Sequence, residues 1–298
     1  MTRFALVLGF PRSGGTLLRR ILDQHPDVSC PAEPWLTTAC ARFLTDVAAE
    51  GVPIGVRTGL GFAGIAEAEV TEALRGLLFR FHAQMAQGKP VWVEKSGFDL
   101  FHLPALADLL VGHARFICLV RHPLDVIASN LDLAARMGRF MPEMDPYFAQ
   151  HPIAIEALAA AWADRTQAML DFAAAQGEAA VVARFEDLVA DPVATLAPVF
   201  GLLDVAAMDA AQIAAAVVAP ARPGLGDWKQ GGEGLTAAPV GRWTKTIPRR
   251  SAAGLMDRLG PLMARLNYEV LPQPRRPTRA DAIRQMVVAA RLPAGPKA

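Results

Sequence analysis

A glycine-rich turn directly after a short apolar run is the feature that most constrains the fold of this chain. Apolar residues 4–8 lead into GFPRSGGT at 9–16, and a helical pattern begins at Leu17. A strand, a tight turn and a helix start in this order are typical of a phosphate-binding loop. Against the Walker A spacing G-x-x-x-x-G-K-[ST], Gly15 occupies the lysine position. We therefore expect an anion site with Arg12 as the substitute cation, the alternative being a strand–turn–helix corner without a ligand.

The identity of the anion depends on that missing lysine. In P-loop NTPases the lysine reaches the β- and γ-phosphates, and a Walker B aspartate follows another strand. Here the apolar run 115–120 leads into Arg121 instead. The sequence thus favours a phosphate-containing group donor that carries fewer charges at its reacting end than ATP or GTP. It also favours binding without a metal ion. Four residues would wrap the phosphate of this donor: Ser13, Gly14, Gly15 and Thr16.

Apolar runs that resemble strands recur along the chain and alternate with helical patterns. They cover residues 4–8, 91–93, 115–120 and 180–185. Such alternation predicts an α/β fold, with a P-loop-type parallel sheet flanked by helices on both faces. Ligands of these sheets bind beyond the carboxyl ends of the strands, so we expect the chemistry at that edge.

Helices and irregular segments fill the spaces between the strands. An amphipathic pattern predicts a helix from Ile155 to near Gly177, and a second helix begins at Pro192. The less regular regions 51–64 and 136–152 are expected to be insertions over the binding edge. Within the second region, residues 136–148 contain methionine and phenylalanine and predict an apolar wall of the binding site.

The C-terminal part of the chain differs in composition. Residues 222–245 are rich in glycine, which is typical both of a loop that closes over a ligand and of an ordinary surface loop. Residues 242–298 carry 12 Lys and Arg against 3 Asp and Glu. We expect one α/β domain over 1–271, then a Pro- and Arg-rich linker with a short terminal helix over 272–298.

Charge and cysteine content narrow the partners and the compartment. The formal net charge is +1, from 30 basic and 29 acidic residues, so nucleic acid and anionic membranes are not expected partners. Three cysteines cannot all pair, which favours a reduced intracellular protein. No stretch has the roughly 18 apolar residues of a membrane span. We expect a cytoplasmic protein.

A second anion-binding pair is predicted at the end of the strand at 115–120. Arg121 follows this strand, and Ser129 lies eight residues further on, inside the next helix. If that helix folds back across the sheet edge, the two side chains can hold a second phosphate. Taken alone, a strand-end arginine is more often solvated or paired.

Two further candidates, Lys95 and Glu33, come from other parts of the chain. Lys95 lies just past the strand at 91–93 and would face the same edge as the glycine loop. The alternative is a surface ion pair between Lys95 and Glu94. Glu33 lies on a loop after the first helix, where a carboxylate is usually just solvated.

Two of these motifs resemble those of the sulfotransferases that use 3′-phosphoadenosine 5′-phosphosulfate (PAPS). PRSGGTLLRRILDQHPDV is similar to their 5′-phosphosulfate loop, and RHPLDVIAS to their 3′-phosphate element. The run from the loop to HPDVSC most resembles the branch of tyrosylprotein sulfotransferases and their bacterial relatives. The resemblance covers 4–35 and 89–132 well, and 180–203 and 224–245 loosely.

The resemblance implies an activity. A sulfuryl group would move in line from PAPS to a hydroxyl of a small-molecule, lipid or peptide acceptor, releasing adenosine 3′,5′-bisphosphate without a metal. PAPS carries this group on a single 5′-phosphate, so a lysine reaching for a γ-phosphate would have nothing to bind. The alternative is a P-loop nucleotide or small-molecule kinase, and a third possibility is a nucleotide-binding module without catalysis.

The resemblance also implies roles, residue by residue. Lys95 would bridge the sulfuryl oxygens and the leaving oxygen, where charge develops. Glu33 would take the acceptor proton, because the histidine used by the cytosolic branch is replaced here by Gly97. Arg12 would assist at the leaving phosphate. The 5′-phosphosulfate would be bound by Arg12, Ser13, Gly14, Gly15 and Thr16, and the 3′-phosphate by Arg121 and Ser129. Arg242 would be a further donor ligand, with Trp228 and Lys229 as weaker candidates.

The chain departs from the family pattern at several positions. Gly15 replaces a common threonine, Phe185 a tyrosine that contacts the nucleotide, and Leu133 an arginine near the 3′-phosphate. Cys30 matches a disulfide cysteine of the secretory enzymes, but no cysteine lies near Lys95 to pair with it. A Golgi enzyme is therefore not expected.

Overall fold

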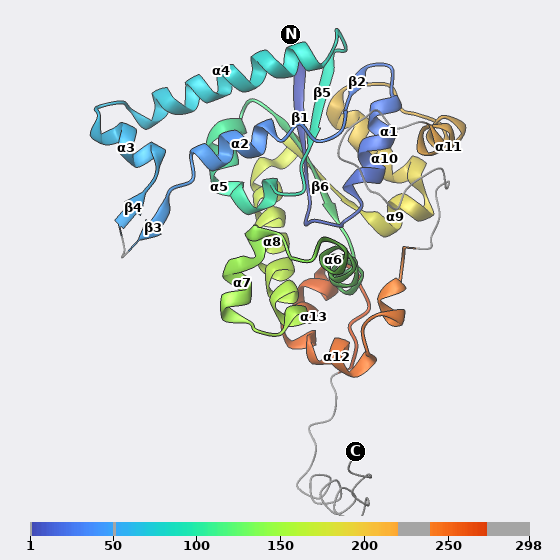
Figure 1. Cartoon of the computed structure of the whole chain (residues 1–298). Coiled ribbons are helices and arrows are strands. Elements are labelled where there is room, and N and C mark those ends of the chain that lie inside the picture. Colours follow the sequence, from blue (N-terminus) through green and yellow to red (C-terminus); the bar gives the residue numbers. More distant parts are fainter. Residues whose placement is uncertain (1, 50–51, 220–238, 273–298) are drawn as a thin grey trace, which may run out of the picture.

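A five-stranded parallel sheet forms the centre of the computed structural model, which describes residues 2–49, 52–219 and 239–272 (Figure 1). The strand order is β2-β5-β1-β6-β7, so the strand before the glycine loop is central, between β5 and β6. The five strands are β1 (Arg3–Leu8), β2 (Val28–Ser29), β5 (Val91–Lys95), β6 (Arg115–Val120) and β7 (Ala180–Arg184). All pairings in this sheet are parallel, which confirms the predicted fold class.

The predicted strands agree with the observed ones to within two residues. The run 115–120 is β6 itself, and the run 91–93 extends to Lys95. The run 180–185 is one residue too long, because Phe185 begins helix α9 (Phe185–Ala190). Strand β2 was not predicted, since two residues are too few to produce a periodic pattern.

Helices cover one face of the sheet next to the glycine loop. Apolar side chains of these helices pack against alternate strand residues, such as Ala5 and Val7 of β1. A strand directs successive side chains to opposite faces, so Phe4, Leu6 and Leu8 of β1 belong to a second core. In Figure 1 these helices lie together on the right of the sheet: α1 (Gly15–Gln24), α10 (Pro192–Leu203) and α11 (Ala210–Val218).

A larger core lies on the opposite face, where Phe4, Leu6, Trp92 and Trp162 are buried. Each such side chain contributes roughly 1.5–3 kcal/mol by leaving water. The long helix predicted from Ile155 is confirmed as α8. The helices of this face are α2 (Leu36–Phe43), α4 (Glu67–Met85), α5 (Leu103–Leu110) and α8 (Ala154–Gln176). Helices thus cover both faces, as predicted.

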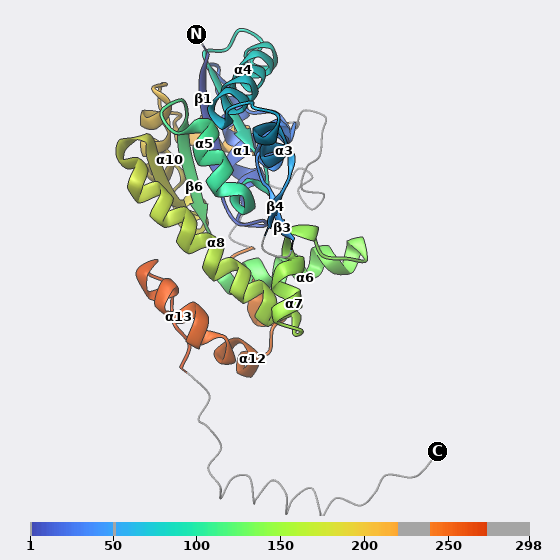
Figure 2. The same ribbon diagram turned by 90° about the vertical axis from the view of Figure 1, so that its left-hand side faces the viewer.

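Further elements lie beyond the carboxyl ends of the strands and beside the sheet. Figures 1 and 2 both place α6, α7, α12 and α13 past the end of β6. Their bounds are α6 (Pro123–Met137), α7 (Asp145–Gln150), α12 (Arg249–Gly254) and α13 (Met256–Arg265). An antiparallel hairpin and a short helix lie to the side, as β3 (Val47–Ala49), β4 (Val52–Ile54) and α3 (Val56–Phe62). The 3₁₀ turns are η1 (Asp99–His102), η2 (Pro142–Met144), η3 (Gly177–Ala179) and η4 (Arg242–Lys245).

The sequence predicted that two segments, 136–152 and 51–64, lie over the binding edge, and only the first of them does so in the structure. Region 136–152 forms the end of α6, η2 and α7, and several of its residues line the cavity described below. For 51–64 the expectation is wrong: its described residues form β4 and α3, α3 packs against α4, and none of them lines that cavity. Residues 273–298 of the predicted linker and helix lie outside the described residues, as do Trp228 and Lys229. The division of the chain at residue 271 stays a prediction.

Candidate active site

A cavity of about 1210 Å³ lies at the carboxyl edge of the sheet. Its walls come from the loop after β1, the ends of β5 and β6, the helices α1 and α6 that follow β1 and β6, and the region after α6. Every described residue that the sequence singled out as a site residue lines this one cavity: Arg12, Ser13, Gly14, Gly15, Thr16, Glu33, Lys95, Arg121, Ser129 and Arg242. The topology therefore brings together residues that lie up to 230 positions apart in the chain.

The glycine loop requires glycine at position 14 for two reasons. Gly14 caps α1 with φ of +98°, which lies in the left-handed region. A Cβ at this position would also collide with the Phe185 ring. Since α1 begins at Gly15, the first backbone N–H groups of the helix have no acceptor within it and are available to an anion.

Gly15 is explained by Lys95. A Cβ at position 15 would lie 2.6 Å from Lys95 Cε, so the aliphatic part of Lys95 occupies the space beside the loop. The amino group thus reaches the loop from β5, although the loop itself has no lysine at the Walker position. The sequence pointed to Arg12 as the substitute cation and expected Lys95 at the same edge, and both residues line the cavity at the loop.

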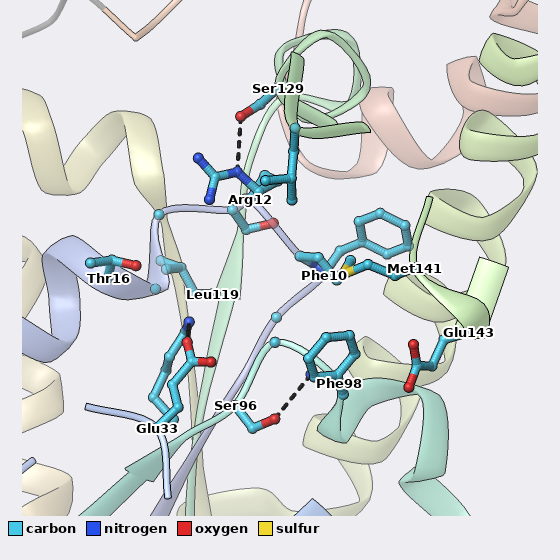
Figure 3. A pocket seen from close by; sticks show the side chains of 18 of the residues that line it. Phe10, Arg12, Thr16, Glu33, Ser96, Phe98, Leu119, Ser129, Met141 and Glu143 are labelled. Carbon is cyan, nitrogen blue, oxygen red and sulfur yellow. Dashed lines mark hydrogen bonds and ion pairs between the residues drawn. The ribbon is translucent and has the colours of Figure 1, made fainter. Parts of the chain in front are cut away.

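Lys95 forms an ion pair with Glu33. Glu33 lies at the cavity wall (Figure 3). The side chains of Lys95 and Glu33 are 14% and 15% exposed, and Trp35 Nε1 donates to the second Glu33 oxygen at 3.0 Å. The alternative pairing of Lys95 with Glu94 is wrong. Glu94 points to the opposite face of β5, because consecutive strand residues alternate. A base candidate and a cation therefore lie next to each other beside the glycine loop.

Arg12 connects the two predicted anion elements. Its backbone is left-handed, with φ of +77°, and its Nε donates to Ser129 Oγ at 3.1 Å. Arg121 Nη1 donates to the Arg12 carbonyl at 2.9 Å, and Asn130 Nδ2 donates to the Pro11 carbonyl at 3.1 Å. Helix α6 thus folds back across the sheet edge, which was the condition for Arg121 and Ser129 to act at one site.

Arg121 is held in a buried position. Its guanidinium lies 4.5 Å from the centre of the Phe185 ring, and Nη2 donates to the Pro239 carbonyl at 2.6 Å. Burial lowers the pKa of Arg121, and the nearby Asp125 and Glu186 act in the opposite direction. Phenylalanine at 185 therefore retains an aromatic surface under the arginine, even though the hydroxyl of the expected tyrosine is absent.

The segment after residue 239 is fastened to α6. Asp125 accepts hydrogen bonds from the N–H groups of Gly241 at 2.7 Å and Trp243 at 2.9 Å. Arg242 lines the cavity and pairs with Asp132 of α6. Arg242, which the sequence predicted to bind the donor, therefore lies at the cavity and against α6, the helix that carries Ser129 and follows Arg121.

A buried polar network lies next to the Lys95 end of β5, and the sequence analysis did not find it. Thr38 Oγ1 donates to Asp99 Oδ1 at 2.6 Å and lies 2.8 Å from Ser96 Oγ. Asp99 is fully buried, and burial first and Glu94 second raise its pKa to about 8. The network joins α2 to the turn after β5 and so connects the segments that carry Glu33 and Lys95.

The raised pKa of Asp99 predicts a pH-dependent stability. An unfolded aspartate titrates near pH 3.9, so between about pH 4 and pH 8 the folded state binds more protons than the unfolded one. The free energy of unfolding should therefore fall as pH rises through this range. Urea unfolding of the wild type and of Asp99→Asn at pH 5 and pH 8 checks this. The variant should show a shallower decline, and equal declines would contradict the assignment.

Three further cavity residues were also missed: Arg42, His102 and Glu143. They come from α2, η1 and η2 and lie about forty or more positions apart, so no local motif could reveal them.

Among the described residues, no group of three or more His, Cys, Asp or Glu could hold a metal ion. Within the same residues, no helix has the length and apolar character needed to cross a bilayer.

Comparison with known proteins identifies the family. Residues 5–209 match the profile of the Sulfotransferase family. The chain belongs to the sulfotransferase family. It is 32% identical over 113 residues to protein-tyrosine sulfotransferase 1 of Danio rerio, covering 38% of this chain and 31% of the relative. It is also 57% identical over 37 residues to nodulation protein NoeE of Sinorhizobium fredii, covering 12% of this chain and 9% of the relative.

Solved sulfotransferase structures share the fold. The sulfotransferase domain from the curacin biosynthetic pathway aligns with a TM-score of 0.62 at 18% identity, covering 91% of this chain and 99% of that one. Mouse sulfotransferase SULT7A1, complexed with PAP, aligns with a TM-score of 0.52 at 13% identity, covering 88% and 85%. The aligned segments of the two curated relatives named above cover less than a third of each relative's own length.

Proposed function

We propose that this sulfotransferase uses PAPS as its donor and transfers the sulfuryl group to an acceptor hydroxyl. One observation carries the proposal: Arg12 and Arg121, from different strand ends, contact each other beside the glycine loop, with Lys95 against Gly15. A nucleotide with separate 3′- and 5′-phosphates needs two such cationic positions. The mouse relative complexed with PAP supports a donor of this kind.

Each residue then has a role in transfer. The loop amides and Arg12 hold the 5′-phosphate, and Arg121 with Ser129 holds the 3′-phosphate. Bound PAPS supplies the sulfuryl group: a bond forms between the acceptor oxygen and sulfur while the bond from sulfur to the 5′-phosphate oxygen breaks. Glu33 takes the proton of the acceptor hydroxyl, and Lys95 stabilises the charge that develops on the leaving oxygen. Arg242 is proposed as a further donor ligand.

The direct test is transfer of labelled sulfate from PAPS to a panel of alcohols, phenols and peptides. Adenosine 3′,5′-bisphosphate without metal should raise the melting temperature, because a ligand that binds only the folded state stabilises it. Under the same conditions ATP with Mg²⁺ should have no comparable effect. Stabilisation by ATP with Mg²⁺ alone, together with no sulfate transfer, would overturn the proposal.

Replacing Glu33 with glutamine should abolish most turnover. The amide cannot accept the proton, and general-base catalysis is typically worth about 10²–10⁴-fold. Binding of adenosine 3′,5′-bisphosphate, measured by calorimetry, should be preserved. Glu69→Gln, an exposed residue on α4, is the matched control and should leave both quantities unchanged. Full activity of Glu33→Gln would remove Glu33 from the mechanism.

Replacing Arg121 with alanine should weaken donor binding. Loss of charge-assisted hydrogen bonds worth about 1.5–3 kcal/mol corresponds to roughly 10–100-fold in Kd. Calorimetry should compare adenosine 3′,5′-bisphosphate with adenosine 5′-phosphate, which lacks the 3′-phosphate. The variant should lose affinity for the first more than for the second. Equal losses for both nucleotides would place the 3′-phosphate elsewhere, and exposed Arg80→Ala serves as the control.

A further inference from the structure

A second polar cluster, formed by Arg42, His102 and Glu143, lines the same cavity away from the glycine loop. In Figure 3, Glu143 lies on the opposite side of the view from Thr16 and Glu33. None of the roles proposed above uses these three residues. They therefore provide polar groups in a part of the cavity where no contact with PAPS has been proposed.

The contacts within this cluster involve only some of its side-chain nitrogen and oxygen atoms. Arg42 Nη2 pairs with Glu143 Oε1, and Arg42 Nε donates to His102 Nε2 at 3.4 Å. The Arg42 guanidinium also lies 5.8 Å from the centre of the Phe98 ring. One arginine thus fixes both neighbours in place and keeps them close together.

Two buried atoms of the cluster have no hydrogen-bond partner in the described part of the chain: Glu143 Oε2 and His102 Nδ1. The Glu143 side chain is only 10% exposed. Burial first and the charge of Arg42 second lower the pKa of His102, which favours the neutral ring, while Glu143 acts in the opposite direction. A neutral ring that accepts at Nε2 carries its proton on Nδ1. The cluster therefore offers one acceptor and one donor.

The surroundings make these two atoms costly to leave unpaired. The nearby cavity wall is largely apolar and includes Trp35, Phe98, Phe140, Met141 and Pro142. A buried polar group without a partner costs about 1–3 kcal/mol. A ligand group that satisfies both atoms gains this energy, whereas a ligand ending in a methyl group does not.

We propose that Glu143 and His102 form a polar subsite for a second hydroxyl of the acceptor, distant from the hydroxyl that receives the sulfuryl group. The acceptor class is then an apolar or aromatic molecule with hydroxyls at both ends. A hydroxyl has both a donor and an acceptor, so its chemistry matches the acceptor on Glu143 and the donor on His102. A carboxylate can accept from His102 but has no proton to donate to Glu143, and an ammonium group can donate to Glu143 but cannot accept from His102, so each leaves one of the two atoms unpaired. This inference rests on the proposed function.

The test uses phenols with straight 4-alkyl chains of graded length, each ending in methyl, hydroxyl, carboxylate or ammonium. With PAPS as donor, the hydroxyl-ended compound of best length should exceed its methyl-ended analogue by roughly tenfold in kcat/KM, as for a buried hydrogen bond. The two charged ends should rank below the hydroxyl. Equal kcat/KM for hydroxyl and methyl ends at every length would overturn the subsite.

Glu143→Gln tests the residue itself. Its carbonyl oxygen can still accept from Arg42, but its amide then presents a second donor to the ligand in place of the acceptor Oε2. The hydroxyl preference should fall to near one, while kcat/KM for the methyl-ended compound changes little. The matched control is Glu178→Gln, an exposed residue that precedes β7 at the opposite edge of the sheet. A hydroxyl preference that survives in Glu143→Gln would overturn the assignment.

A binding experiment separates failure of the subsite from failure of the proposed function. Calorimetry measures the same compounds with protein saturated with adenosine 3′,5′-bisphosphate. A hydroxyl preference in binding that Glu143→Gln removes, without any sulfate transfer, would support the subsite and overturn the proposed function. Sulfate transfer without a hydroxyl preference in binding or turnover would support the proposed function and overturn the subsite.

Discussion

Replacing Lys95 with alanine is expected to lower kcat for sulfuryl transfer by about 10²–10³-fold, the usual effect of removing one group that stabilises transition-state charge. Lys95 reaches the glycine loop over Gly15, and its ammonium group forms an ion pair with Glu33. Affinity for adenosine 3′,5′-bisphosphate should fall much less, because the two arginine contacts remain. Steady-state kinetics with PAPS and calorimetry with the product separate these two effects.

A substitution at Gly15 provides a control, because it tests the contact between this position and Lys95. A methyl group at Gly15 would meet Lys95 Cε at 2.6 Å, so Gly15→Ala should displace the lysine and reduce kcat in the wild-type background. In the Lys95→Ala background the space is open, and the same change should have little further effect. This non-additivity is the signature of two residues in contact. Additive losses would show that Lys95 does not act at the loop.

Replacing Glu94 with alanine is expected to lower the free energy of unfolding by about 3–5 kcal/mol, because it breaks a fully buried polar network. Glu94 is 1% exposed and accepts hydrogen bonds from Thr37 N at 3.1 Å and Thr37 Oγ1 at 2.7 Å. Its Oε2 also lies 2.8 Å from Nε2 of buried His82. Alanine would leave these partners without an acceptor and open a cavity.

Urea unfolding with tryptophan fluorescence measures this loss. Glu94→Gln keeps the shape and one carbonyl acceptor, so it should cost less than alanine. Glu69→Ala on the surface of α4 is the control for removing a glutamate and should change stability by less than about 0.5 kcal/mol. A loss below about 1 kcal/mol for Glu94→Ala would mean that water or other groups replace the carboxylate.

Glu94 also illustrates where sequence reasoning failed. The sequence placed Glu94 next to Lys95 and left open an ion pair between them. The strand directs their side chains to opposite faces, so Glu94 meets α2 and α4 while Lys95 meets the glycine loop and Glu33. The prediction of a base candidate at Glu33 needed the family resemblance, since a loop carboxylate has no local signal of its own.

The glycine loop, the main strands and the parallel sheet follow from the sequence by itself, because a strand, a turn and a helix start are set by contacts between neighbouring residues. Only the tertiary structure decided which side chains meet in the cavity. The contact of Lys95 with Gly15, the pairing of Arg12 with Ser129, and the cluster of Arg42, His102 and Glu143 each join residues 40 or more positions apart. Such contacts depend on strand order, register and helix packing, which no local pattern encodes.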